Sequence, residues 1–416
     1  MTANRIFRSI IARITSTIAI PRTAQARSSS PIAEESLARY RLGGYHAVRI
    51  GDRLQDGHYQ VICKLGYGVY STVWLVKDST TKRHVALKIL TADAYFGEHD
   101  TFELSILEHI KSINELHPGE AHVLGLLDHF KHEGPHGSHL CLVFKAMGPS
   151  LIEYRRLFPL LRIPIPILKK IARQMLLALS FLHTKCGIIH TDIKPSNILL
   201  ETTQTDKFFE RAPSTVFEPS PSARDPQHDF YMKSEQTIPA NEVLESVPSP
   251  PGFSVRIADF GTASYFDKHL TDNIQPVGLR APEVVLRAEW DYKVDIWNLG
   301  CLIWELAEGA MLFDGCASPK TPYTADAHLA QIQGVLGPMP LNLIRQWENA
   351  SKYYNDSGAL LVESPFPPTS FAAFINSPEL QDEAEQKQFL EFIGSMLKWD
   401  PKERLDADGL LKSEWL

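Results

Sequence analysis

The sequence lacks the long apolar stretches of membrane proteins and the paired cysteines of disulfide or zinc scaffolds. It contains no run of about 18 apolar residues, the length that a bilayer-spanning helix requires, so we expect no membrane span. Its five cysteines are scattered without CxxC spacing. Metal fingers and a disulfide framework are therefore poor interpretations, and a reducing compartment is expected. No internal repeat is evident.

The composition is that of a soluble globular protein. Of 416 residues, 44% are hydrophobic and 22% are charged, which argues against disorder along the whole chain. The length suffices for a two-lobed globule with appendages. The net charge of −7 is uneven, because residues 1–39 carry six arginines and two glutamates and leave −11 for the remainder. This acidic body argues against direct binding of nucleic acid and permits a basic protein substrate, but charge alone favours a solvated surface without a partner.

Acidic residues are absent from the first thirty positions. On a helix, apolar side chains would share one face and arginines the other (Ile6, Phe7, Ile10, Ile11, Ile14 and Ile18 against Arg5, Arg8 and Arg13). This pattern is typical of a mitochondrial transit peptide. The alternative that we favour is a disordered basic extension of a cytoplasmic and nuclear protein. In either case we expect residues 1–39 to lie outside the fold, whose globular part begins near Tyr40.

The stretch HTDIKPSNILL, residues 190–200, holds polar groups between two apolar segments that we expect to be buried strands. Buried charge is costly unless it is paired or binds a metal. The spacing of Asp192, Lys194 and Asn197 matches a loop that catalyses phosphoryl transfer. In that chemistry the aspartate accepts a hydroxyl proton, the lysine neutralises the transferring group and the asparagine binds Mg²⁺. An ordinary loop with a turn-forming asparagine is the alternative.

Strands are predicted over residues 59–65, 71–78 and 84–90, and a glycine-rich hairpin joins the first two. Glycines let a backbone present its N–H groups to phosphate oxygens, although a tight hairpin needs glycine as well. A valine beyond the hairpin and a lysine on the third strand complete a nucleotide-clamping pattern. The predicted nucleotide-binding residues of this region are Leu65, Gly66, Tyr67, Gly68, Val69, Tyr70, Ser71, Thr72, Val73, Ala86 and Lys88.

Lys88 requires an acidic partner on the helix that follows, and the candidates are Glu103 and Glu108. Apolar residues follow Glu103 at helical spacing (Ile106, Leu107 and Ile110), so Glu103 faces the apolar side of the helix and Glu108 faces away from most of it. We therefore choose Glu103.

Residues 201–252 are rich in proline and serine and show no sustained period, which predicts a mobile insert. A strand then ends in Asp259-Phe260-Gly261, where the aspartate matches a metal ligand that acts across nucleotide phosphates. Ala281-Pro282-Glu283 follows as the end of an activation segment. Apolar spacing predicts core helices over residues 167–183 and 295–306.

Six motifs occur in family order over residues 59–416, namely GYGVYSTV, VALK, the helix glutamate, HTDIKPSN, DFG and APE. The chain resembles a eukaryotic protein kinase of the Ser/Thr branch. This implies an α+β, bilobal fold with a β-rich N-lobe (residues 59–147) and a larger helical C-lobe (residues 148–416) in a kinase domain of residues 40–416. GGYHAVRIGD, HTDIKP and VDIWNLGCLIWEL are similar to fungal-type SR-protein kinases, which phosphorylate serines of Arg-Ser-rich splicing factors.

The resemblance implies a role for each matching position. Asp192 is the proton acceptor with Lys194 beside it, and Asn197 and Asp259 bind Mg²⁺. Lys88 with Glu103 fixes the α- and β-phosphates of ATP. The strand over residues 139–147 leads into the hinge, with Phe144 limiting the pocket and Met147 lining it. Glu283 forms a buried ion pair with Arg404, whose loss would destabilise the C-lobe.

The same resemblance implies ATP and Mg²⁺ as cofactors, a basic Arg-Ser-rich protein partner, a monomer and a part in the regulation of mRNA splicing. Thr191 replaces the usual arginine that pairs with an activation-loop phosphate, so we expect activity without that phosphorylation. Lys145 and Ser196 also depart from the family, at positions outside catalysis. A pseudokinase scaffold and a kinase with a non-Arg-Ser substrate are the alternatives. The first is disfavoured because Lys88, Asp192, Asn197 and Asp259 are all present.

Overall fold

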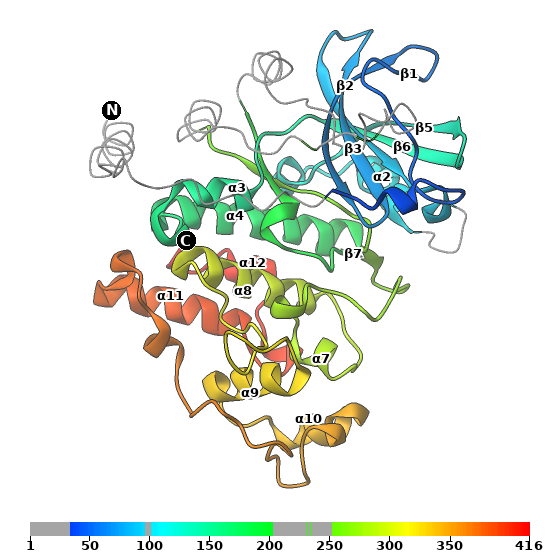
Figure 1. Cartoon of the computed structure of the whole chain (residues 1–416). Helices are drawn as coiled ribbons and strands as arrows, with labels where there is room; N and C mark the ends of the chain where they lie inside the picture. The colour runs from blue at the N-terminus through cyan, green and yellow to red at the C-terminus, as the bar shows by residue number, and fades with distance from the viewer. Residues whose placement is uncertain (1–33, 96–100, 203–230, 232–233, 235–251) are drawn as a thin grey trace, which may run out of the picture. The chain divides into compact units, whose positions relative to one another are not determined.

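A six-stranded antiparallel sheet forms the core of the N-terminal part of the chain (Figure 1). The computed structural model describes residues 34–95, 101–202, 231, 234 and 252–416. The strand order is β1-β2-β3-β4-β6-β5. The strands are β1 (Arg53–Leu54), β2 (Tyr59–Gly68), β3 (Ser71–Asp78), β4 (His84–Leu90), β5 (Leu126–Gly134) and β6 (Gly137–Lys145). The three strands predicted from the sequence are confirmed as β2, β3 and β4.

The described residues belong to two compact units. The first takes its members from residues 1–101, 125–149 and 200–254, and therefore contains the sheet. The second takes its members from residues 102–124, 150–199 and 255–416.

One face of the sheet carries an apolar core. Side chains alternate between the two faces of a strand, so Trp74, Leu87 and Val143 point to the same side from three neighbouring strands. All three are at most 1% exposed. The opposite face is therefore left to the residues between them, among which are the predicted nucleotide-binding positions Val73, Ala86 and Lys88.

The fold begins earlier than we predicted. Glu35 is 3% exposed and its carboxylate contacts the buried ammonium of Lys64 on β2, while Leu37–Arg39 form a short 3-10 helix. The expectation that residues 34–39 lie outside the fold is wrong, because a buried ammonium needs a counter-charge and these residues supply it. Residues 1–33 lie outside the described part of the chain, as does most of the predicted insert, of which Glu201, Thr202, Tyr231, Ser234 and Gly252 are described.

The second unit is mainly helical (Figure 1). Its helices are α2 (Glu103–Ser112), α3 (Leu151–Tyr154), α4 (Ile165–Phe181), α7 (Pro282–Val285), α8 (Lys293–Glu308), α9 (Ala325–Leu336), α10 (Leu341–Gln346), α11 (Glu383–Met396) and α12 (Ala407–Leu410). Short strands β7 (Ile188–Ile189), β8 (Ile198–Leu200), β9 (Val255–Ile257) and β10 (Ser264–Tyr265) form two small ladders, β7 with β10 and β8 with β9. Sheet and helices together confirm the predicted α+β fold class.

Helices α4 and α8 pack together in the core of the second unit. The apolar residues that predicted α4 from their spacing are all buried, and α8 is buried along its whole length except at Lys293. Helix α8 ends at Gly309, whose φ of +74° is left-handed and whose missing Cβ would lie 2.0 Å from the carbonyl oxygen of Leu160. No helix within the described ranges combines the length and apolarity that a membrane span requires.

A cluster of histidines in the first unit makes its stability sensitive to acid. His46 is 6% exposed, and its ring lies 4.6 Å from that of His132 and 5.0 Å from that of His139. Burial, reinforced by the neighbouring histidines, lowers the pKa of His46 from 6.5 to about 3. Between these two values the unfolded chain binds a proton that the folded chain excludes. The contribution of His46 is therefore complete above about pH 6.5 and is lost as the pH falls towards 3.

We expect His46→Gln to flatten this acid dependence. In the unsubstituted protein, protonation linked to His46 should lower the free energy of unfolding by about 2 kcal/mol as the pH falls from 6.5 to about 5. One differentially bound proton changes this free energy by about 1.4 kcal/mol per pH unit. Urea unfolding at several pH values measures the slope. The control is His129→Gln, which removes an exposed imidazole. An unchanged slope in His46→Gln would contradict the assignment.

Candidate active site

The loop between β7 and β8 brings Asp192, Lys194 and Asn197 together. Lys194 Nζ donates to Asp192 Oδ2 over 2.6 Å, and Asn197 Nδ2 donates to the same oxygen over 2.9 Å. Asn197 Nδ2 also donates to the backbone oxygen of Asp192 over 3.0 Å. Both side-chain donors act on Oδ2, so the carboxylate is held in one orientation while its side chain remains 18% exposed.

Asp295 on α8 supports this loop by accepting hydrogen bonds from its backbone. Our sequence analysis missed this role. The fully buried carboxylate accepts the N–H of His190 through Oδ2 and the N–H of Thr191 through Oδ1, each over 2.8 Å. His183 Nε2 lies 2.9 Å from Oδ2. An acid in the first turn of a helix that is apolar nearly all round was the available signal, because a buried carboxylate requires partners.

His190 connects the loop to β9. Its Nδ1 accepts the N–H of Asp192 over 3.2 Å, so its Nε2 carries the proton and donates to the carbonyl oxygen of Ala258 over 3.1 Å. The N–H of Ala258 donates in turn to the carbonyl oxygen of Asn197 over 2.8 Å. These bonds hold the residue before Asp259 against the catalytic loop within the second unit.

Asp259 projects an exposed carboxylate from a strained backbone. Its φ of +69° is left-handed, a conformation that a non-glycine residue adopts at an energetic cost and that is typical of functional sites. Asn197 turns its amide nitrogen to Asp192, which directs its amide oxygen away from that residue. A carboxylate and an amide oxygen are donors that suit Mg²⁺. No group of three or more histidine, cysteine or acidic residues in the described part of the chain is placed to hold a metal by itself.

The register of the sheet places four of the predicted nucleotide-binding residues on one face, whereas Thr72, two residues before Trp74, lies on the face of the apolar core and accepts a hydrogen bond from Trp74 Nε1 over 2.9 Å. Val73 pairs with Lys88, and Ala86, two residues earlier on β4, pairs with Phe144. Because paired and alternate residues share a face, these four lie opposite the apolar core. Leu65 packs against a small second cluster, and Met147 is buried just after β6.

The hairpin between β2 and β3 is exposed at its tip, whereas Ser71 and Thr72 at the start of β3 are buried. Gly66 pairs with Val73, Tyr67 with Thr72 and Gly68 with Ser71, so the glycines lie at the turn. The side chains of Tyr67, Val69 and Tyr70 are 40%, 63% and 39% exposed. An exposed turn with two glycines leaves its backbone accessible to a phosphate group.

Helix α2 orients its glutamates as the helical spacing predicted. Glu103 is 2% exposed, whereas Glu108 lies on the exposed side. Lys88 and Glu103 belong to different units, so their pairing stays a prediction. The pairing of Glu283 with Arg404, by contrast, lies within the second unit and is present, with Arg404 nitrogens 2.6 and 2.7 Å from the two carboxylate oxygens.

Comparison with known proteins decides the family. The model of the protein kinase domain matches residues 59–213 and 239–416. The chain belongs to the protein kinase family. Serine/threonine-protein kinase SRPK of Physarum polycephalum is 34% identical over 92% of this kinase and 91% of its own length. Protein kinase dsk1 of Schizosaccharomyces pombe is 30% identical over 92% and 85%, and SRSF protein kinase 3 of Mus musculus is 26% identical over 95% and 93%.

These matches confirm the predicted family and enzyme class. The protein is a serine/threonine kinase of the SRPK type, and ATP is its phosphoryl donor as for the protein kinase domain in general. The roles of the individual site residues stay predictions. The geometry above supplies the contacts on which these predictions depend, for Asp192, Lys194, Asn197 and Asp259.

Thr191 holds the activation segment of this kinase by neutral hydrogen bonds. Its hydroxyl donates to the carbonyl oxygen of Thr262 over 2.8 Å, and its carbonyl oxygen accepts the N–H of Gln275 over 3.0 Å. Gln275 Oε1 accepts the N–H of Ala281 over 2.8 Å. Thr262 and Gln275 are therefore fixed to the catalytic loop directly, and Ala281 is fixed through Gln275, without a phosphate.

We accordingly expect the purified kinase to keep its activity after exhaustive phosphatase treatment. The measurement is the peptide phosphorylation rate before and after treatment, with loss of phosphate verified by mass spectrometry. A kinase that depends on an activation-loop phosphate serves as the control and should lose activity in parallel. Abolished activity in this kinase would contradict the expectation.

Proposed function

We propose that this kinase transfers the γ-phosphate of ATP to serines of Arg-Ser-rich proteins, with Asp192 as the proton acceptor and Lys194 beside the transferring group. The observation that supports this is the fixed carboxylate of Asp192. Lys194 and Asn197 both donate to Oδ2, which leaves Oδ1 to face an incoming hydroxyl. A base positioned in this way typically accelerates the chemical step by about 10²–10⁴-fold.

In the proposed step the serine oxygen attacks the γ-phosphorus and the bond to the β-phosphate oxygen breaks, releasing ADP. The serine proton passes to Asp192. Lys194 offsets the negative charge of the transferring phosphoryl group, and its 2.6 Å contact with Asp192 keeps the ammonium at the carboxylate. Asn197 and Asp259 would hold Mg²⁺, which neutralises charge on the ATP phosphates when it is bound.

The remaining proposed roles belong to the nucleotide. Lys88, with Glu103 as its partner, would fix the α- and β-phosphates of ATP, and the turn of Gly66–Ser71 would present backbone N–H groups to them. Ala86, Phe144 and Met147 would line the adenine site.

A basic substrate agrees with the charge of the chain. Residues 40–416 carry −11, and an acidic body attracts an arginine-rich peptide. Several similar proteins are named SRPK or SRSF protein kinase. We further propose a monomer that works in the cytoplasm and nucleus without binding nucleic acid directly. The mitochondrial alternative depends on the first thirty residues, which lie outside the described part.

The test of the substrate class compares an Arg-Ser repeat peptide with the same peptide carrying glutamine for each arginine. We expect kcat/KM to be about tenfold or more higher for the arginine peptide, and this ratio to shrink as salt is added. Equal values for the two peptides would retain the kinase and reject the Arg-Ser substrate. Phosphorylation of neither peptide by a protein that binds ATP would favour a scaffold.

A further inference from the structure

We propose that the insert after the catalytic loop positions the glycine-rich turn through a buried cluster in the first unit, and thereby strengthens ATP binding. The Lys64 cluster consists of Glu34, Glu35, Lys64, Tyr231 and Ser234. Tyr45 is the positioning residue that connects it to the turn. The proposal rests on the function proposed above, because it assigns the turn to ATP.

Lys64 is the centre of the cluster. This β2 side chain is fully buried, yet it carries an ammonium group. Its Nζ lies 3.0 Å from Glu34 Oε2 and in contact with the carboxylate of Glu35, whose side chain is 1% exposed. Burying a charge is tolerated only when partners satisfy it, so residues 34 and 35 must be held in place for Lys64 to remain where it is.

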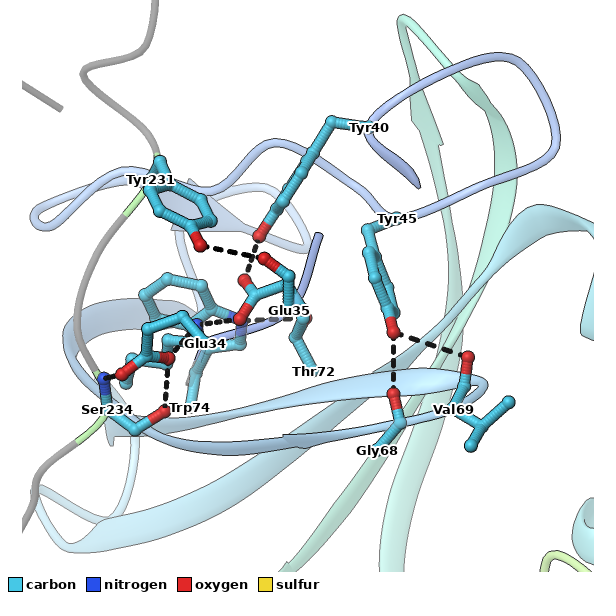
Figure 2. A network of polar contacts seen from close by, with 11 residues as sticks. Glu34, Glu35, Tyr40, Tyr45, Gly68, Val69, Thr72, Trp74, Tyr231 and Ser234 are labelled. Carbon is cyan, nitrogen blue, oxygen red and sulfur yellow. Dashed lines mark hydrogen bonds and ion pairs between the residues drawn. The ribbon is translucent and has the colours of Figure 1, made fainter. Parts of the chain in front are cut away.

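Two residues of the insert close the cluster (Figure 2). Tyr231 donates its hydroxyl to the backbone oxygen of Glu35 over 2.7 Å. Ser234 donates its N–H and its hydroxyl to the carboxylate of Glu34, over 2.8 and 2.9 Å. The insert therefore binds the very segment that neutralises Lys64, from about 200 positions away in the sequence.

From the cluster two routes lead to the glycine-rich turn. Tyr40 donates its hydroxyl to the carboxylate of Glu35, and its ring lies 6.2 Å from that of Tyr231 and 5.5 Å from that of Tyr45. Tyr45, which is 2% exposed, donates its hydroxyl to the carbonyl oxygen of Gly68 over 2.6 Å (Figure 2). The second route is direct, since the Lys64 ammonium lies 5.4 Å from the centre of the Tyr67 ring.

These contacts bear on nucleotide binding because the turn is otherwise exposed. Gly68 pairs with Ser71 at the tip of the hairpin, and a glycine turn has more conformational freedom to lose than any other. Fixing the Gly68 carbonyl group in the free kinase reduces the ordering cost that ATP would have to meet. Loss of the Tyr231 contact should loosen residues 34–45 and with them the turn.

Hydroxyl deletions in the full chain test the proposal. We expect Tyr45→Phe to raise the Kd of ATP about fivefold and Tyr231→Phe to raise it about threefold, since one net hydrogen bond is involved in each case. The double variant should raise the Kd of ATP by less than the product of the two single effects, because both substitutions act in part on the route through Tyr45. Calorimetry measures Kd without turnover, and steady-state kinetics should show the same rise in KM for ATP with kcat nearly unchanged.

Tyr59→Phe is the matched control. It removes another tyrosine hydroxyl from the same sheet, one that donates to Asp128 over 2.9 Å at the end of β2 opposite the turn. Its ATP Kd should remain that of the unsubstituted kinase. An unchanged Kd in Tyr231→Phe, or strictly additive effects in the double variant, would overturn the coupling. Failure of phosphoryl transfer with these Kd shifts intact would reject the proposed function and leave the coupling standing.

Discussion

Asp192→Asn should lower kcat for peptide phosphorylation about a thousandfold and leave the Kd of ATP nearly unchanged. Asparagine keeps the size of the side chain and an oxygen that accepts from Lys194 and Asn197, which lie 2.6 and 2.9 Å from the aspartate oxygen. It cannot accept a proton from serine. The loss should therefore fall on the chemical step.

Rapid-quench measurement of phosphate transfer and calorimetry of ATP binding separate the two effects. The matched control is Asp356→Asn, which makes the same change at an exposed carboxylate of the second unit and should leave both quantities unaltered. If Asp192→Asn retained more than about a tenth of kcat, the role of proton acceptor would have to be given up, since a positioned base contributes at least about a hundredfold.

Arg404→Met should destabilise the second unit by about 3–5 kcal/mol. The Arg404 and Glu283 side chains are completely buried and joined by two hydrogen bonds of 2.6 and 2.7 Å. Arg404 Nε also donates to the carbonyl oxygen of Lys398, and its guanidinium lies 5.0 Å from the centre of the Trp297 ring. Removing the arginine leaves a buried carboxylate without its counter-charge, which is the costly case for an ion pair.

Urea unfolding monitored by tryptophan fluorescence measures this loss. Lys387→Met is the control, because Lys387 and Glu391 form an exposed pair at 4.0 Å whose removal should cost less than about 1 kcal/mol. The double variant Glu283→Gln/Arg404→Met should recover part of the stability, since it no longer buries a charge alone. Equal stabilities for Arg404→Met and Lys387→Met would show that the buried pair contributes nothing beyond a surface pair.

The elements that position the site could be predicted because their signals are local. Alternation marked β2, β3 and β4, and apolar spacing separated Glu103 from Glu108 on α2. The catalytic loop can be predicted because the residues that carry its chemistry, Asp192 and Asn197, lie at a characteristic spacing within one short stretch of sequence.

What could not be predicted depends on contacts between distant residues. Nothing near Lys64 shows that its counter-charges lie thirty positions earlier, so residues 34–39 were assigned to a disordered extension. The polar partners of Asp295 are likewise more than a hundred positions away. A buried charge indicates that a partner exists, but its sequence position follows only from the fold.

The central claim is that this chain is an active protein serine kinase, and multiple-turnover transfer tests it most directly. The full chain would be incubated with Mg²⁺, γ-labelled ATP and an Arg-Ser peptide, and the phosphate on peptide serine counted per molecule of enzyme. We predict many phosphates per enzyme molecule, almost all of them lost in Asp192→Asn. Bound ATP without transfer to any serine peptide would contradict the account and identify the chain as a nucleotide-binding scaffold.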